Sequence, residues 1–405
     1  MNGGSFKLRE HGTTFAKELS AGVTGFLTVI YIIAVNGLIL SEAGMPFEAA
    51  AAATIVSAAA GCLIMAFWAN APVIIVPGMG INAMFTYTFV NEMGMTWQQA
   101  LGVTVVSGVL FAAVTLTPLA EKLNAVVPSS LKEAITIGLG LFLIVIGVEK
   151  AGFSWPALLT LVLAVILFWR KVPGTFIWVI AAGTGIAWLF GTLPESTGSV
   201  GLKSYASVFG AWTVEGMSPL VLVPAVFSLT MVLLFENIGL VHGHLSLAKQ
   251  PEKFKRTIQA NAAAVVASGL AGSSANVAAV ESAAPIASGG RTGLVPLTAG
   301  LLFPIAFIAA PYLNLVPGSA VAPILIIIGT LMAMNIRQLS VSDWTEWIPA
   351  LAIIAIIPLT SSIADGIAAG FILYPLVKIT RGRFREVPVP MYVIAVLFLM
   401  NIVIH

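Results

Sequence analysis

Long apolar segments recur along almost the whole chain, and they constrain its fold more than any other feature. A helix needs about 20 apolar residues to cross the hydrocarbon of a bilayer, and fewer when it is broken or shielded by neighbouring helices. By this criterion we predict fourteen transmembrane spans, numbered here in chain order. They cover residues 19–40, 48–69, 72–90, 98–119, 131–149, 155–170, 173–192, 219–244, 257–271, 274–289, 293–313, 318–335, 346–360 and 363–379.

The composition agrees with a protein that lies in a membrane. Of 405 residues, 59% are hydrophobic and 9% are charged, whereas a soluble domain carries about 25% charged residues. The net charge of +2 is too small to indicate a nucleic-acid partner. The single cysteine, Cys62, excludes an intramolecular disulfide and any metal site built from several cysteines. The first twenty residues are polar and show no cleavage site, so we expect no signal peptide.

The basic residues indicate how the spans are oriented. If the N-terminus is cytoplasmic, all but two of the 19 lysines and arginines fall at cytoplasmic positions, as the positive-inside rule requires. The two exceptions are Lys150 and Lys203. We therefore expect a multi-pass protein of the plasma (inner) membrane with a cytoplasmic N-terminus. The apolar segment 389–404 is either a fifteenth crossing or a helix packed against the rest.

A polar stretch near the middle of the chain divides the spans into two halves. We predict a first seven-span repeat in residues 1–192, an extracellular or periplasmic linker in 193–218, and a second seven-span repeat in 219–405. Because each half has an odd number of spans, the second half must insert upside down relative to the first. This inverted-repeat plan is typical of secondary transporters.

Two carboxylic acids interrupt apolar spans. Glu236 lies in LTMVLLFENIGLV of span 8, and Glu281 lies in NVAAVESAAPIA of span 10. Acids are rarely kept inside a membrane without a function, because low dielectric disfavours their charged form. The pair is suited to proton-coupled transport, in which one acid holds the substrate and the other carries the proton. A structural role for either acid is the alternative.

Spans 3 and 10 contain breaks at corresponding places in the two halves. In span 3, a β-branched run ends at Pro77 and Gly78 in PVIIVPGMGINAMF; in span 10, a short extended stretch that includes Ala279 precedes Glu281 and Ser282. Extended backbone at membrane depth must be buried in protein or line a cavity, where a substrate can bind it. The alternative is an ordinary proline kink with glycines that serve packing.

Residues 78–82 supply further candidate binding groups. Gly78 and Gly80 allow close approach to a substrate, and Asn82 offers both a hydrogen-bond donor and an acceptor. His242 and His244 follow Glu236 in span 8, and we favour an interface role for both. No motif of a hydrolase or metalloprotease occurs in the spans, so we expect no enzyme activity and no cofactor or metal.

Several motifs together resemble one family of transporters. PGMGINAMFTY at 77–87, AGVTGFLTVIYIIAVN at 21–36, ESAAPIASGGRTGL at 281–294 and PLTSSIADGIAAG at 358–370 are similar to the AzgA-like adenine, guanine and hypoxanthine permeases. These are nucleobase cation symporters with the uracil permease fold. The resemblance covers nearly the whole chain. It implies a core domain (spans 1–4 and 8–11), a gate domain (spans 5–7 and 12–14), and short strands in spans 3 and 10 that hold a planar base.

The resemblance also implies roles for individual residues. Asn82 would line the purine site, Glu281 would bind the edge of the base, and Glu236 would take the acidic position of span 8. This last position departs from the family's pattern, because FENIGLV at 235–241 replaces a motif of the type FDTVGTL. Function as an acid survives this change, and the longer glutamate is the residue seen at this position in uracil permease relatives.

The function expected from the sequence is import of purine nucleobases by proton symport, with alternating access of an elevator type implied by the resemblance. Carriers of uracil or xanthine, and small-anion transporters of the same fold, are the alternatives. The preferred purine, proton or sodium as the coupling ion, and a homodimeric state are left open.

Overall fold

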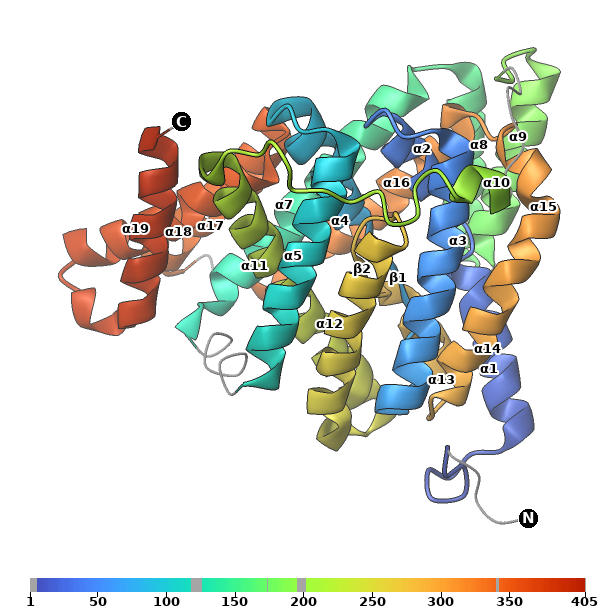
Figure 1. The fold of residues 1–405 in the computed structure, drawn as a ribbon, viewed down its shortest axis with the longest axis horizontal. Coiled ribbons are helices and arrows are strands. Elements are labelled where there is room, and N and C mark those ends of the chain that lie inside the picture. The colour runs from blue at the N-terminus through green and yellow to red at the C-terminus, as the bar shows by residue number, and fades with distance from the viewer. Residues whose placement is uncertain (1–5, 118–125, 173, 195–201, 340–341, 405) are drawn as a thin grey trace.

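The computed structural model describes residues 6–117, 126–172, 174–194, 202–339 and 342–404, and within these ranges the chain is mostly helical (Figure 1). In the described residues, seven helices are long and apolar enough to cross a membrane, and five more apolar helices are shorter. Each predicted span coincides with a helix, a kinked pair of helices, or a short strand followed by helical turns.

The first half of the chain contains one short strand among its helices. Its elements are α1 (Phe15–Val29), α2 (Ile32–Ser41), α3 (Phe47–Ile64), the π-helix η1 (Met65–Ala69), β1 (Ile75–Pro77), α4 (Met79–Ala83), the π-helix η2 (Met84–Glu92), α5 (Trp97–Leu116), α7 (Ser129–Ala151), α8 (Trp155–Trp169) and α9 (Thr175–Leu189).

The second half repeats this order of elements, with its strand again in the third span of the half. Its elements are α11 (Pro219–Ala248), η3 (Pro251–Lys253), α12 (Phe254–Leu270), β2 (Asn276–Ala278), η4 (Val280–Ser282), α13 (Ala283–Ala287), α14 (Leu294–Leu302), η5 (Phe303–Ile305), α15 (Ala306–Leu313), α16 (Gly318–Ala333), η6 (Met334–Gln338), α17 (Trp344–Thr360), α18 (Ile363–Thr380), η7 (Phe384–Glu386) and α19 (Val389–Ile404). The short helix α10 (Leu202–Tyr205) lies in the predicted linker.

The two strands pair with each other, although 200 residues of sequence separate them. They run antiparallel, with Ile75 opposite Ala278 and Pro77 opposite Asn276. The β-branched run before Pro77 favours an extended backbone, and each strand supplies the hydrogen-bond partners that the membrane interior lacks. The prediction of short strands in spans 3 and 10 is confirmed.

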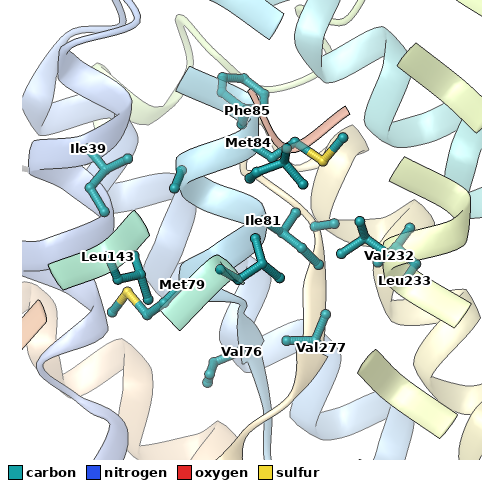
Figure 2. Packing of buried hydrophobic residues seen from close by; sticks show 14 of the residues in the cluster. Ile39, Val76, Met79, Ile81, Met84, Phe85, Leu143, Val232, Leu233 and Val277 are labelled. Atoms are coloured by element: carbon teal, nitrogen blue, oxygen red, sulfur yellow. The ribbon is translucent and has the colours of Figure 1, made fainter. Parts of the chain in front are cut away.

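Buried apolar side chains from several helices pack around this strand pair. Figure 2 shows Val76 and Val277 on the strands and Met79 near Leu143 of α7. It also shows Ile81 of α4 on the side of that helix toward Val232 of α11. All of these side chains belong to one buried cluster. The strand pair is therefore enclosed by protein, as an extended backbone in a membrane must be.

Two regions differ in detail from the predicted spans. Span 11 is divided into α14, η5 and α15, because Pro304 in η5 lacks the N–H that a continuous helix requires. Segment 389–404 forms α19, which packs on α18 and α11. Its Phe398 ring lies 5.8 Å from Phe371 and 5.0 Å from Phe227, measured between centroids.

The described part of the predicted linker, residues 202–218, lies along one end of the helices, opposite the N-terminus (Figure 1). The N–H of Thr213 donates to the carbonyl of Gln98, and the N–H of Gly210 donates to the carbonyl of Leu270. The linker thus contacts the ends of α5 and α12. Residues 195–201 of this linker, and Lys122 near span 4, lie outside the described residues.

Candidate functional site

The strand pair brings spans 3 and 10 together and determines where the half-helices begin. The N–H of Gly78 donates to the carbonyl of Ala275 (3.1 Å), and the N–H of Ala279 donates to the carbonyl of Ile74 (2.9 Å). α4 starts directly after Gly78, and η4 starts directly after Ala279. Asn82 and Glu281 therefore both lie within five residues of a strand end, one after each strand of the same small sheet.

Asn82 is fully buried, and among the described residues only the oxygen of its amide group has a hydrogen-bond partner. Its Oδ1 accepts a hydrogen bond from the Ser274 hydroxyl (2.6 Å), which also reaches Oδ1 of Asn36 (3.4 Å). Among the described residues, Nδ2 of Asn82 has no hydrogen-bond partner. Because a buried amide donor without a partner is costly, this group is available to a ligand or a water molecule.

Glu236 lies on α11 beside the second strand. Its neighbour Asn237 is fully buried, accepts a hydrogen bond from the N–H of Ala278 (3.1 Å) and donates to the carbonyl of Leu233 (2.8 Å). Asn237 thereby ties α11 to β2 and holds Glu236 next to the sheet. Oε2 of Glu236 is buried and has no hydrogen-bond partner among the described residues, so this oxygen can accept a hydrogen bond from a ligand or a water molecule.

Glu281 lies in η4 and has one defined partner. Its Oε1 accepts a hydrogen bond from the hydroxyl of Tyr31 (2.6 Å), which belongs to the break between α1 and α2. Tyr31 is only 4% exposed, whereas Glu281 is partly exposed. Span 1 therefore joins spans 3, 8 and 10 around the strand pair.

The remaining predicted site residues make contacts within the protein. Ser282 is buried, and its hydroxyl accepts a hydrogen bond from the N–H of Ile74 (3.0 Å), which connects η4 to β1. A Cβ on Gly78 would lie 2.6 Å from Val277, and one on Gly80 would lie 3.1 Å from Leu139 of α7. A side chain at Gly78 would therefore collide with Val277, whereas one at Gly80 would need Leu139 to shift by a few tenths of an ångström. Ala279 is buried at the strand end.

The two histidines of α11 pack against neighbouring segments. The imidazole of His242 stacks on Phe254 with 4.0 Å between ring centroids. Nε2 of His244 lies 3.3 Å from the carbonyl oxygen of Val280, at the start of η4. Their geometry is that of interface residues. In the described residues, no group of three or more His, Cys, Asp or Glu side chains is placed to hold a metal ion.

Sequence reasoning missed three residues: Tyr31 and Asn237 beside the candidate site, and Glu18 in the first turn of α1. Glu18 is fully buried, and its carboxylate accepts hydrogen bonds from the N–H of Arg291 (2.7 Å), the N–H of Thr292 (3.1 Å) and the Thr292 hydroxyl (2.7 Å). It thereby fixes the loop after α13. Asn237 could have been found from the sequence, because it is a polar residue beside Glu236 in an otherwise apolar helix. Tyr31 could not, because its partner Glu281 lies 250 residues away.

The fold of the whole chain is that of known membrane transporters. The transmembrane domain of a cyanobacterial bicarbonate transporter, BicA, superposes with a TM-score of 0.69 at 17% identity and covers 88% of this chain and 97% of that chain. The murine anion transporter Slc26a9 in its inward-facing state gives a TM-score of 0.69 at 13% identity over 91% of this chain and 69% of that chain. These similarities define a polytopic membrane transporter fold, as predicted.

Sequence comparison then identifies the family. Residues 16–369 match the permease family labelled Xan_ur_permease, and the chain belongs to this family. The nucleobase transporter PlAzg2 of Paenibacillus larvae is 48% identical over 382 residues, which are 89% of this chain and 77% of that protein.

Two further relatives match almost end to end. The guanine/hypoxanthine permease PbuO of Bacillus subtilis is 35% identical over 98% of this chain and 100% of its own length. The adenine permease AdeP of Escherichia coli is 34% identical over 98% of this chain and 95% of its own length. The resemblance to purine permeases is confirmed, and the protein is an integral membrane permease. The boundaries of its repeats, linker and domains stay predictions.

Proposed function

We propose that the protein imports purine nucleobases by symport with protons. The observation that carries this proposal is the set of polar groups at the strand pair: Nδ2 of Asn82 and Oε2 of Glu236, which have no hydrogen-bond partner among the described residues, and the carboxyl of Glu281. The relatives that match nearly the whole chain are named for guanine, hypoxanthine and adenine, which supports a purine as the substrate.

The chemistry of a purine suits these groups. A purine is planar and nearly neutral, and its edge carries both N–H donors and lone-pair acceptors. Carboxylate oxygens accept from such donors, and the amide of Asn82 donates to such acceptors. In this proposal Glu281 binds the edge of the base and Asn82 contributes a donor, and Gly78 and Ala279 directly precede the half-helices that carry these two residues.

Proton coupling is assigned to the two acids. Glu236 and Glu281 lie in apolar spans, where a carboxyl group can take up and release a proton during a transport cycle. A base bound to one acid would change the electrostatic environment of the other, which couples binding of the base to uptake of the proton. Sodium is the competing ion, and the test below separates the two.

Alternating access requires two parts of the molecule to move relative to each other. We assign spans 1–4 and 8–11 to a core that carries the site and spans 5–7 and 12–14 to a gate. In the structure, Glu42 at the end of α2 forms an ion pair with Lys150 at the end of α7, a contact between the two proposed parts. We also propose that the N-terminus lies in the cytoplasm, which reporter fusions at either terminus of the chain would test.

Uptake of radiolabelled bases tests the proposal. We would express the protein in bacteria that lack their own nucleobase permeases and measure adenine, guanine, hypoxanthine and uracil, with and without a protonophore and with sodium replaced. We expect purine uptake that the protonophore abolishes and that sodium replacement leaves intact. Glu281→Gln and Glu236→Gln should abolish it, whereas Glu215→Gln, at an exposed position of the linker, should retain it.

The outcomes discriminate among the alternatives. Uptake of uracil alone would overturn the substrate class, and uptake that follows the sodium gradient would overturn the coupling ion. Absence of any uptake from a protein that is folded and in the membrane would leave the permease family membership intact and remove the purine assignment.

A further inference from the structure

Tyr31 lies at the point where the first span is interrupted. α1 ends at Val29 and α2 begins at Ile32, so Tyr31 belongs to the short break between the two helices. Its side chain is 4% exposed, and its hydroxyl donates to Oε1 of Glu281 across 2.6 Å. The break allows a residue of span 1 to reach the carboxyl group of span 10, whose sequence position is 250 residues away.

The aromatic ring of Tyr31 is held separately from its hydroxyl. The ring packs edge-on against Phe176 of α9, with 4.7 Å between centroids and 61° between planes. Phe176 is also buried. Aromatic pairs of this geometry stabilise each other without help from a polar substituent. The ring therefore keeps its place if the hydroxyl is removed, which separates the packing role of Tyr31 from its hydrogen bond.

The backbone around Glu281 does not depend on Tyr31. The Ser282 hydroxyl accepts from the N–H of Ile74, the N–H of Ala279 donates to the carbonyl of Ile74, and His244 lies against the carbonyl of Val280. These three contacts anchor η4 on both sides of Glu281. What the Tyr31 hydroxyl adds is a second restraint on the carboxyl group itself, besides the hydrogen bond from the backbone N–H of Glu281.

We propose that Tyr31 is a positioning residue for Glu281, which occupies one carboxylate oxygen and directs the other toward an N–H donor on the edge of a nucleobase. This inference rests on the proposed function. A phenol in this position donates to Glu281, so Oε1 is held as an acceptor of the protein's own hydrogen bond and Oε2 is left for the ligand. The substrate class is a planar heterocycle that offers an N–H donor.

Loss of the Tyr31 hydroxyl should lower the affinity for the base and leave the transport rate of the loaded carrier unchanged. Pre-organising a binding group removes the entropy that its ordering would cost when the ligand arrives. Without the hydroxyl, the carboxyl samples orientations that do not bind the base. Once the base is bound, the core and gate contacts that govern movement are unchanged, because the ring of Tyr31 still packs on Phe176.

The test compares two tyrosines that each donate to a glutamate. In Tyr31→Phe the hydroxyl that reaches Glu281 is lost; in the control Tyr87→Phe the hydroxyl that donates to Glu42 (2.7 Å) is lost. We would measure the concentration dependence of uptake of whichever purine the native protein imports. For Tyr31→Phe we expect KM to rise about tenfold, with the maximal rate within about twofold of native. Tyr87→Phe should leave KM unchanged.

Each other outcome overturns the inference. An unchanged KM in Tyr31→Phe would show that the hydroxyl does not position the binding group. A fall in maximal rate with native KM would assign Tyr31 to the movement of the carrier instead. Tyr31→Leu, which also removes the ring, must raise KM at least as much as Tyr31→Phe. The amount of folded protein in the membrane, measured by size-exclusion chromatography of a fluorescent fusion, normalises every rate.

The proposed function can fail independently of this inference. If the native protein imports no purine, the proposed function is wrong and the inference falls with it. If the native protein imports a purine and Tyr31→Phe has native KM, only the positioning role is wrong.

Discussion

At the scale of single residues, the site depends on amides that connect segments distant in sequence. Asn237 bonds both its own helix and the strand β2, and the Asn82 amide is held by Ser274 while its donor stays open. Buried polar groups of this kind specify one arrangement because each alternative leaves a donor or acceptor unpaired. The carboxyl groups acquire their positions from these neighbours.

Replacing Asn237 should therefore affect both stability and transport. Asn237→Ala leaves the N–H of Ala278 without its acceptor, and an unsatisfied buried donor costs about 1–3 kcal/mol. We expect a lower melting temperature of the purified protein and a higher KM for uptake. Asn91→Ala, at an exposed position, is the matched control. Equal melting temperatures for Asn237→Ala and the native protein would contradict the role given to this amide.

A second prediction concerns Glu18, whose two carboxylate oxygens accept three hydrogen bonds from Arg291 and Thr292. Glutamine offers one acceptor oxygen in place of two, so Glu18→Gln should destabilise the protein by about 1–3 kcal/mol. Thermal unfolding in detergent measures the effect. Glu10→Gln removes an exposed carboxylate from the same terminal region and should be nearly neutral, and similar losses in both variants would argue against the buried network.

At the scale of elements, close helix packing depends on small residues. α7 and α16 approach at Gly140 and Gly329, where a Cβ on Gly329 would lie 2.4 Å from the carbonyl oxygen of Gly140. Glycines at such contacts let helix backbones approach closely in a membrane, where no hydrophobic effect drives the helices together. The contact belongs to spans 5 and 12, both assigned to the gate.

Alanine substitutions at two glycines should affect the stability of the protein differently. Gly329→Ala must push α7 and α16 apart, and overpacking of this kind costs about 1–3 kcal/mol. Gly185→Ala, in α9, meets nothing within 4 Å, and should be neutral or slightly stabilising because alanine favours the helix. Melting temperatures of the two variants provide the comparison. A loss of stability in Gly185→Ala as large as that in Gly329→Ala would rule out helix approach as the cause.

The start of α17 provides a prediction about pH. Hydrogen bonds from the hydroxyl and the N–H of Thr345, and then the guanidinium of Arg383, hold the pKa of Asp343 well below its usual value. A lowered folded-state pKa gives stability that is complete above the unfolded-state pKa and is lost as pH falls through the folded-state value. The contribution of Asp343 is therefore constant at neutral and mildly acidic pH.

The measurement is the difference in melting temperature between the native protein and Asp343→Asn. We expect this difference to be equal at pH 8 and about pH 5 and to shrink only below about pH 4, where the unfolded carboxyl group becomes protonated. A difference that already declines between pH 8 and about pH 5 would mean that the hydrogen bonds do not lower this pKa as described.

At the scale of the whole molecule, the structure joins the proposed core and gate at the end opposite the N-terminus. Glu42 of α2 pairs with Lys150 of α7, and the Thr88 hydroxyl of η2 accepts from the N–H of Ile363 (3.3 Å) at the turn before α18. Alternating access requires such contacts to break and re-form in each cycle. A covalent bond across them should then stop transport.

A disulfide tests this movement directly, because the chain's single cysteine, Cys62, is buried. In the double variant Glu42→Cys with Lys150→Cys, we expect an oxidant to abolish purine uptake and a reductant to restore it. The control pair Lys7→Cys with Glu10→Cys replaces an ion pair within one segment, so its oxidation should leave uptake intact. Full transport by the crosslinked Glu42 and Lys150 variant would contradict relative movement at this contact.

The sequence by itself determined the class of the protein and the chemical character of its site. Runs of apolar residues can satisfy their backbone in a membrane only as helices, and the breaks at Pro77 and before Glu281 marked where strands replace them. These are local properties, so they can be read from short stretches of the chain. The candidate acids followed from the same local reasoning.

Only the tertiary structure decided which residues meet. The hydrogen bonds that join Tyr31 to Glu281 and Ile74 to Ser282, and the close approach of Gly78 to Val277, all connect segments far apart in the chain. The link from Asn237 to Ala278 connects residues 41 positions apart. Such contacts depend on how helices are oriented against each other, and hydropathy carries no information about a partner two hundred residues away. Folding therefore brings two isolated acids into a candidate site in which, among the described residues, some hydrogen-bonding groups have partners and others have none.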